Sequence, residues 1–399
     1  MVMIEKKRRS NFSNSLFNSV NILMGTGLLS LPFAFSITGY GLGLVLLVLF
    51  AVITHHTGML LGKCLNKCKA NDEAGFTYSD IGQAAFGIPG RTFISILFFL
   101  ELGTVAVALV ILTADSIVAL FPMYDPMYVK IIVATSVIPV TWPRSLSLIS
   151  YISLIGIIAM GNLIGILSYN GLSKQQAPGS IIHSVPVNAV PLSYSHIPLS
   201  FGLLMAGFCG HSVFPQIYHD MRHPEKYNKL LNYSYLIVVF IYGFVGVIGY
   251  LMFGADTKDE ITQNIPLIPE YNKILSNLMI GLVAINAFTK YPISISPLNS
   301  QLEEIIRYFF DTRPSIRRIL AITLSGGIIL FISIAVPEFH KVMALLGSVF
   351  AFTVSVVFPS CCYMSLFGQK LSKLEWAIEI FITLSGIVMG SLGTAWVFL

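Results

Sequence analysis

Eleven apolar runs, most of them about 20 residues or longer, divide this chain of 399 residues. About 20 such residues are needed for a helix to cross the hydrocarbon core of a bilayer. Charged residues make up only 11% of the chain, against about 25% in a typical soluble domain. The pattern predicts an all-α integral membrane protein with eleven transmembrane helices and no separate soluble domain. The expected spans are roughly 12–36, 41–65, 92–120, 127–143, 147–168, 198–220, 230–253, 272–293, 317–336, 340–361 and 375–398.

Basic residues are distributed unequally over the two sides that alternating spans create. If the N-terminus is cytosolic, 18 of the 24 lysines and arginines fall on the cytosolic side and five on the other, with Lys290 inside a span. The positive-inside rule therefore predicts a cytosolic N-terminus and a lumenal C-terminus. The division between the fourth and fifth spans, at Trp142-Pro143-Arg144, is the least sharply marked.

The first span contains residues that favour an interruption of the helix. Gly25, Thr26 and Gly27 lie in its middle, and Pro32 follows. Glycine and proline lower the free energy of leaving helical geometry. A break inside a bilayer exposes backbone N–H and C=O groups that lipid cannot satisfy, so it is tolerated only beside protein or a polar cavity. The segment is therefore a candidate binding site, and the alternative is a mild kink with packing glycines.

The sixth span carries a second interruption of the same kind. Gly207, Gly210 and Pro215 bracket a short polar stretch made of Cys209, His211 and Ser212. Breaks in the first and sixth spans predict two five-helix repeats with a site at their interface. The expected organisation is a short cytosolic N-terminus (1–11), a first repeat (12–168, with an interfacial helix near 77–87), a lumenal loop (169–197), a second repeat (198–361) and an eleventh span (375–399).

Two local patterns predict further detail. Thr77 is expected to cap the interfacial helix, with Asp80 in its first turn. Three Gly-x3-Gly motifs, at 58–62, 161–165 and 386–390, predict close contacts between helices.

Four segments carry a resemblance to a known family. They read NSVNILMGTGLLSLPFAF in the first span, FCGHSVFPQIYHDMRHPEKY in the sixth, GYLMFGADTKDEITQNIP (249–266) and NAFTKYPISISPLNSQLEE (286–304). The chain resembles the amino acid/auxin permease family, and is most similar to its fungal and plant vacuolar amino-acid transporter branch. The resemblance implies a LeuT-like fold and proton-coupled movement of amino acids across an organelle membrane. That branch often carries a long hydrophilic N-terminal extension, whereas about ten residues precede the first span here, so regulation through such a tail is not expected.

A broken helix offers partners for both charges of an amino acid. The half-helix after a break begins with free N–H groups, which suit a carboxylate, and the half-helix before it ends in free carbonyls, which suit an ammonium group. His211 is expected to line the cavity, to sense pH, or to be a neutral histidine satisfied by backbone. The expected carboxylate partners are Gly25, Thr26, Gly27 and Leu28, and the expected ammonium partners are carbonyls near Cys209 and Gly210, helped by Asn21 or Ser212.

Two ionisable residues inside spans are candidates for ion coupling. Glu101, in the third span, is expected either to carry a proton or to make a structural hydrogen bond to a neighbouring helix. In LeuT-like sodium carriers a sodium ion bridges the first and eighth spans. The ammonium group of Lys290, near Thr289 in the eighth span, is expected to replace that ion, and the alternative is a lysine that reaches to the interface.

The function expected from these features is secondary active transport of neutral amino acids across a vacuolar or lysosome-like membrane by alternating access. No nucleotide-binding loop is present in the sequence, so ATP is not expected to drive it directly. We expect proton coupling rather than sodium coupling, no metal or other cofactor, no enzyme activity, no nucleic-acid partner, and a monomer in the lipid bilayer. The alternatives are an amino-acid-sensing receptor on the same scaffold and a sodium-coupled carrier of the plasma membrane.

Overall fold

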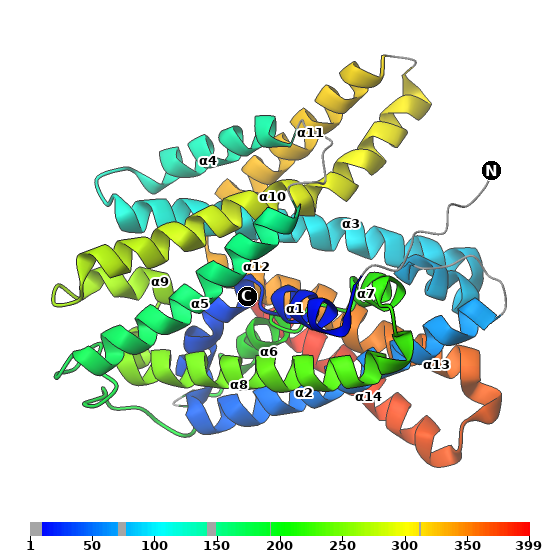
Figure 1. Cartoon of the computed structure of the whole chain (residues 1–399), viewed down its shortest axis with the longest axis horizontal. Helices are drawn as coiled ribbons and strands as arrows, with labels where there is room; N and C mark the ends of the chain where they lie inside the picture. Colours follow the sequence, from blue (N-terminus) through cyan, green and yellow to red (C-terminus); the bar gives the residue numbers. More distant parts are fainter. Residues whose placement is uncertain (1–9, 71–76, 142–148, 192, 311–312) are drawn as a thin grey trace.

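The computed structural model describes residues 10–70, 77–141, 149–191, 193–310 and 313–399, and helices account for most of them (Figure 1). Within these ranges eight helices are long and apolar enough to cross a membrane. The main helices are α1 (Phe12–Leu23), α2 (Leu31–Ala70), α3 (Tyr78–Leu120), α4 (Pro126–Val140), α5 (Ile149–Ser173), α6 (Ile197–Ala206), α7 (Phe214–Asp220), α8 (Tyr227–Phe253), α9 (Ile261–Asn264), α10 (Lys273–Phe309), α11 (Pro314–Ala335), α12 (Phe339–Leu345), α13 (Phe358–Phe367) and α14 (Lys373–Val397).

Two glycines divide helices that would otherwise be too long for one crossing of the membrane. The 40 residues of α2 would extend about 60 Å as a straight helix, which is twice the thickness of the hydrocarbon core. Gly39 has φ 73° and Gly87, in α3, has φ 69°. This left-handed region strongly favours glycine. The turn at Gly39 separates the predicted first and second spans, and the turn at Gly87 separates the interfacial helix from the third.

Most predicted boundaries lie within a few residues of the observed ones. Thr77 caps α3 and forms a capping box with Asp80, as the sequence predicts. The fifth helix continues to Ser173, so the following loop is shorter than expected. The division at Trp142-Pro143-Arg144 lies outside the described residues, and the count of eleven spans stays a prediction.

Helices that correspond in the two predicted repeats lie against one another. In Figure 1, α2 and α8 run alongside each other, and these are the predicted second and seventh spans. The third and eighth, α3 and α10, also pack together. The two halves of the broken sixth span, α6 and α7, contact the broken first span. This pairing brings the two breaks together in the middle of the bundle.

Polar contacts at the two ends of the bundle join residues that the predicted topology places on the same side of the membrane. At one end the pairs are Ser10 with Asp220, Lys67 with Leu366, and Arg318 with Glu303. At the other end they are Lys130 with Pro337, Lys174 with Glu270, and His340 with Asp259. The alternation of spans is thus consistent throughout these contacts, whereas the assignment of cytosol and lumen to the two ends stays a prediction.

The Gly-x3-Gly motifs differ in what they pack against. An added Cβ would lie 2.8 Å from the Tyr227 ring at Gly62 and 2.7 Å from the Ser348 carbonyl oxygen at Gly390. At Gly161 and Gly165 an added Cβ would meet nothing within 4 Å, so the predicted close contact there is wrong for the described residues. The motif creates a strip of small residues on a helix, but it does not by itself determine whether another helix packs against that strip.

The approach of α6 to the tenth predicted span generates a test of this packing. Between α12 and α13 that span widens into two π-helical segments, Leu346–Ala351 and Thr353–Val357. A Cβ at Gly347 would overlap the carbonyl oxygen of Gly202 in α6. Gly347→Ala should therefore destabilise the protein by about 1–3 kcal/mol through overpacking. Thermal melting of the purified protein measures this, and Gly327→Ala, whose Cβ would meet nothing within 4 Å, is the control. Equal melting temperatures for the two variants would contradict the packing described.

Candidate functional site at two helix breaks

The predicted interruption of the first span lies at Met24 and Gly25. Helix α1 ends at Leu23, and the backbone of Gly25 is extended, with φ −81° and ψ −160°. The chain then forms a 3₁₀ helix, η1 (Thr26–Ser30), before α2 begins. Local bonds use the carbonyls of Val20 and Leu23, which accept from the N–H groups of Met24 and Gly25. The last carbonyls of a helix otherwise have no partner within it, so the end of α1 presents acceptors inside the bundle.

The sixth span is interrupted between Gly207 and Val213. Helix α6 ends at Ala206 and α7 begins at Phe214. Short-range bonds partly close the gap, with the Gly210 N–H donating to the Phe208 carbonyl at 2.9 Å. The break thus contains the Cys209 to Ser212 stretch that the sequence predicts.

The two breaks lie directly against each other. A Cβ on Gly27 would come within 2.9 Å of the Gly207 backbone, and a Cβ on Gly210 within 2.9 Å of the Leu23 side chain. Only glycine allows backbones to approach this closely. The glycines of both breaks therefore have a packing role as well as a conformational one.

A tyrosine that the sequence analysis did not single out joins the two breaks. Tyr242 of α8 is fully buried, and its hydroxyl lies within hydrogen-bonding distance of the Leu23 carbonyl and 2.9 Å from the Gly207 carbonyl. These carbonyls belong to the ends of α1 and α6. Tyr242 is one of 17 tyrosines, and no local motif distinguishes it.

The remaining predicted partners of a ligand have different surroundings. The Thr26 hydroxyl donates to the Met343 sulfur at 3.7 Å, and a thioether is a weak acceptor. Leu28 is fully buried, and its N–H donates to the Gly25 carbonyl at 3.4 Å. Ser212 is half-buried inside the break. The hydroxyl of Thr26 is thus held loosely at the start of η1.

Glu101 faces the second break. This residue of α3 is 6% exposed, and the Cys209 thiol donates to its carboxyl oxygen Oε1 at 3.2 Å. The contact brings an ionisable group from the third span to the interrupted segment of the sixth. It is the structural hydrogen bond that the sequence analysis kept as an alternative, and it also places a proton acceptor at the site.

His211 is fully buried and points into the packing between three spans. Its Nε2 lies 3.1 Å from the hydroxyl of Thr57 in α2, and that hydroxyl lies 2.5 Å from the Ser355 carbonyl. A hydroxyl has one proton, and the shorter contact assigns it to Ser355. Nε2 of His211 must then donate, which both a neutral and a protonated imidazole can do, while Nδ1 has no partner among the described residues.

Asn21 and Lys290 come together on the other side of the first span. A Cβ on Gly156 of α5 would lie 3.2 Å from Asn21 Oδ1, 3.1 Å from Asn286 Oδ1 and 3.6 Å from Lys290 Cε. The structure therefore places Asn21 close to the lysine, and its role as a helper for an ammonium group stays a prediction. The Thr289 hydroxyl donates to the Ile285 carbonyl of its own helix at 2.8 Å.

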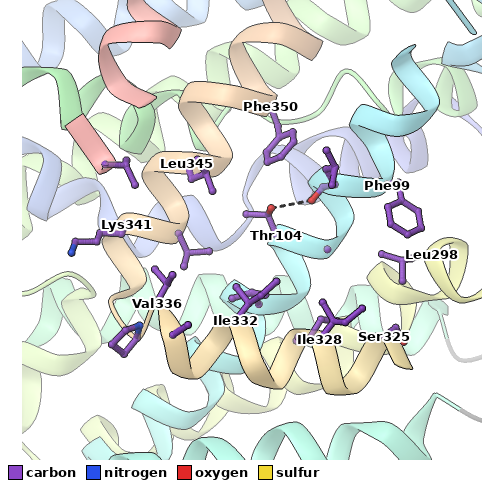
Figure 2. A pocket seen from close by; sticks show the side chains of 18 of the residues that line it. Phe99, Thr104, Leu298, Ser325, Ile328, Ile332, Val336, Lys341, Leu345 and Phe350 are labelled. Carbon is purple, nitrogen blue, oxygen red and sulfur yellow. Dashed lines mark hydrogen bonds between the residues drawn. The ribbon is translucent and has the colours of Figure 1, made fainter. Parts of the chain in front are cut away.

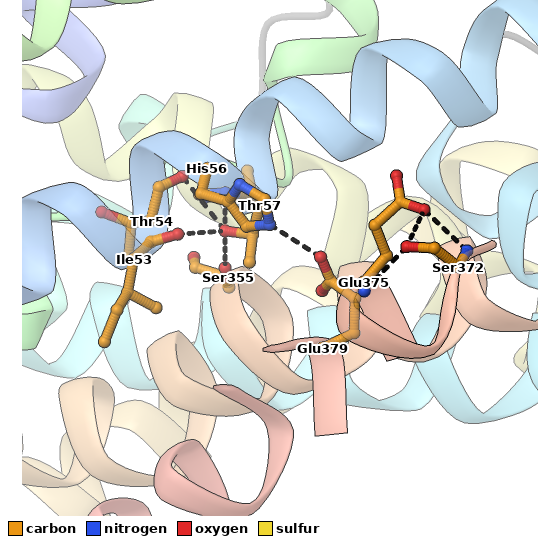
Figure 3. A network of polar contacts seen from close by, with 9 residues as sticks. Ile53, Thr54, His56, Thr57, Ser355, Ser372, Glu375 and Glu379 are labelled. Carbon is orange, nitrogen blue, oxygen red and sulfur yellow. Dashed lines mark hydrogen bonds and ion pairs between the residues drawn. The ribbon is translucent and has the colours of Figure 1, made fainter. Parts of the chain in front are cut away.

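A buried carboxyl in the eleventh predicted span was missed in the sequence. Glu379 of α14 is 3% exposed, and its Oε1 lies 2.7 Å from Nε2 of His56 in α2 (Figure 3). His56 precedes Thr57, the partner of His211. A glutamate inside an apolar span is a visible signal, and attention to every such carboxyl would have found it.

One crevice is lined by residues outside the breaks. It has a volume of about 580 Å³ and lies between α3, α10, α11, the tenth predicted span and the end of α14 (Figure 2). Thr104, Ile328 and Leu345 are among its lining residues, and none of the predicted ligand-binding residues is. Apolar side chains dominate the lining, so it offers little to a carboxylate or an ammonium group.

The fold and the paired breaks define a polytopic helical membrane protein with a LeuT-like core. Amino acid transporter AVT1B of Arabidopsis thaliana is 33% identical over 96% of this chain and 70% of its own length. Amino acid transporter AVT1D of the same plant is 34% identical over 96% and 69%. A manganese transporter structure from Eremococcus coleocola aligns over 97% of this chain and 94% of its own at 13% identity, with a TM-score of 0.50, which bears on the fold alone.

A family model described as "Transmembrane amino acid transporter protein" matches residues 8–399. The chain belongs to this family, and its function is not enzymatic.

The bonding of His211 leads to a test of its role. His211→Leu removes the donor to Thr57 and should lower the free energy of unfolding by about 1 kcal/mol or more, because a buried bond is lost. His211→Gln keeps an N–H donor on a side chain of similar reach and should lose less. Thermal melting of both variants measures the difference. A leucine variant as stable as the wild type, with an altered pH profile of ligand binding, would instead support a pH-sensing histidine.

Proposed function

We propose that this protein is a secondary active transporter that moves neutral amino acids across a vacuolar or lysosome-like membrane by alternating access, with proton coupling. The observation that carries the proposal is the meeting of two broken helices in the middle of the bundle, where Gly27 contacts Gly207. Family membership supports amino acids as the substrate class.

Helix starts and helix ends at the breaks carry opposite partial charges, which suit the two charges of a zwitterion. The carboxylate is assigned to the start of η1, where the N–H groups of Thr26 and Gly27 and the loosely held Thr26 hydroxyl are donors. The N–H groups of Gly25 and Leu28, expected from the sequence to join them, already donate to the carbonyls of Leu23 and Gly25, so they would have to exchange these bonds for the carboxylate. The ammonium group is assigned to carbonyls at the ends of α1 and α6 and near Cys209 and Gly210, with Ser212 as a helper. A neutral side chain is favoured because Glu101 is already engaged by Cys209.

Coupling to protons is assigned to Lys290 and Glu101. The Lys290 side chain lies beside Asn21 of α1 and Asn286 of α10, so its ammonium group can connect these helices as a bound cation would. The Asn286 oxygen Oδ1 is buried and has no hydrogen-bond partner among the described residues. Loss of the proton from Lys290 would remove the positive charge that links α1 to α10, which would couple the proton to movement of α1.

The substrate class and the driving ion can be tested together. Purified protein in liposomes should take up radiolabelled neutral amino acids when a proton gradient is imposed, and an equal sodium gradient should not drive uptake. Acidic and basic amino acids serve as controls for selectivity. Uptake driven only by sodium would overturn the coupling assignment, and binding without flux would favour an amino-acid-sensing receptor.

The lysine itself can be tested by a matched pair of variants. Lys290→Met keeps much of the side-chain volume but removes the charge, so proton-driven uptake should fall to the level of protein-free liposomes. Lys341→Met, at the partly exposed start of the tenth predicted span, should keep uptake close to wild type. Uptake by the Lys290 variant at the wild-type rate would contradict the assignment.

A further inference from the structure

The Tyr242 hydroxyl contacts both broken helices at once. Its oxygen is within hydrogen-bonding distance of the carbonyl that ends α1, at Leu23, and of the carbonyl that follows α6, at Gly207. The side chain is fully buried and comes from α8, which is itself unbroken. One rigid helix therefore provides a donor to the point where the two interrupted helices meet.

The Tyr242 hydroxyl can donate fewer hydrogen bonds than the carbonyls of Leu23 and Gly207 can accept. A phenolic hydroxyl donates one proton, whereas each carbonyl oxygen accepts two hydrogen bonds. The Gly25 N–H also donates to Leu23 at 2.8 Å, while the Gly207 carbonyl receives only Tyr242 among the described contacts. The hydroxyl satisfies one of the two carbonyls at a time. A substrate ammonium group carries three N–H donors and can satisfy both.

The ring of Tyr242 is fixed by its surroundings. A Cβ on Gly207 would lie 2.6 Å from the ring atom Cε2, and the Phe208 ring packs at 5.7 Å between centroids with an interplanar angle of 60°. The hydroxyl therefore stays at the junction, and what changes on substrate binding is which groups its oxygen contacts.

We propose that Tyr242 is a positioning residue that satisfies the break carbonyls when the carrier is empty. The inference rests on the proposed transport function. A carrier that returns empty must bring the two breaks together in low dielectric without the substrate ammonium group, and bare carbonyls there are unfavourable. Tyr242 supplies the missing donor in that state. In the loaded state the ammonium group supplies it, and the hydroxyl is dispensable.

Two transport modes separate this role from general structural support. Net uptake requires the empty carrier to return, whereas exchange of labelled for unlabelled substrate uses only the loaded carrier. With radiolabelled L-alanine, L-leucine and L-tyrosine in liposomes, Tyr242→Phe should reduce net proton-driven uptake about tenfold, the factor for one poorly satisfied buried group. Exchange should stay within about twofold of wild type, because the ammonium group replaces the donor.

A neighbouring tyrosine provides the matched control. Tyr235 lies two turns earlier on α8, is 4% exposed and stacks on Phe208 at 6.0 Å. Tyr235→Phe should leave both modes close to wild type. Equal loss of net uptake and exchange in Tyr242→Phe, or no loss in either, would overturn the proposal. If the wild-type protein transports none of the three amino acids, the proposed function fails instead.

An independent measurement tests the proposal without removing the hydroxyl at position 242. The full chain with 3-fluorotyrosine at position 242 can be followed by fluorine NMR with and without a saturating amino acid. The resonance should shift on binding, because the hydroxyl loses its carbonyl contacts. A resonance that does not move at saturation would mean that the hydroxyl keeps the same partners in both states, which overturns the proposal.

Discussion

Backbone groups that lose their helical partners inside the bilayer are the constraint on which the rest of this structure depends. Lipid offers them no hydrogen bonds, so each break must be enclosed by protein or filled by a ligand. Here each break is partly enclosed by the other. Gly27 and Gly207 let the chains come into direct contact, and Tyr242 adds one donor between them. The proposed transport function assigns the remaining N–H groups and carbonyls at the breaks to the two charges of an amino acid.

Side chains of the surrounding helices hold the second break in position. His211 connects the second break to α2 through Thr57, and Thr57 connects α2 to the π-helical part of the tenth predicted span through Ser355. Glu101 holds the same break from α3. A site with supports from several helices can respond to the movement of any one of them, which is the property that a carrier with alternating access needs.

The sequence predicts the features that depend on local physics. Glycine and proline in an apolar run weaken a helix wherever they stand, so both breaks were predictable, and the Thr77 cap depends only on residues three apart. Contacts between distant helices depend on the rotation of each helix, which one sequence does not define. For this reason the sequence could not predict that Asn21 lies close to Lys290, that Gly161 and Gly165 face no close neighbour among the described residues, or that Tyr242 joins the two breaks.

The central claim is that substrate binds between the breaks, and a native thiol there can report it most directly. Cys209 is half-buried in the second break, and the other four cysteines can be replaced. The measurement is the rate of Cys209 alkylation at increasing concentrations of a transported amino acid. The account predicts that the amino acid slows alkylation, with half-maximal protection at the concentration that half-saturates transport. An alkylation rate that stays constant through saturation of transport would contradict it.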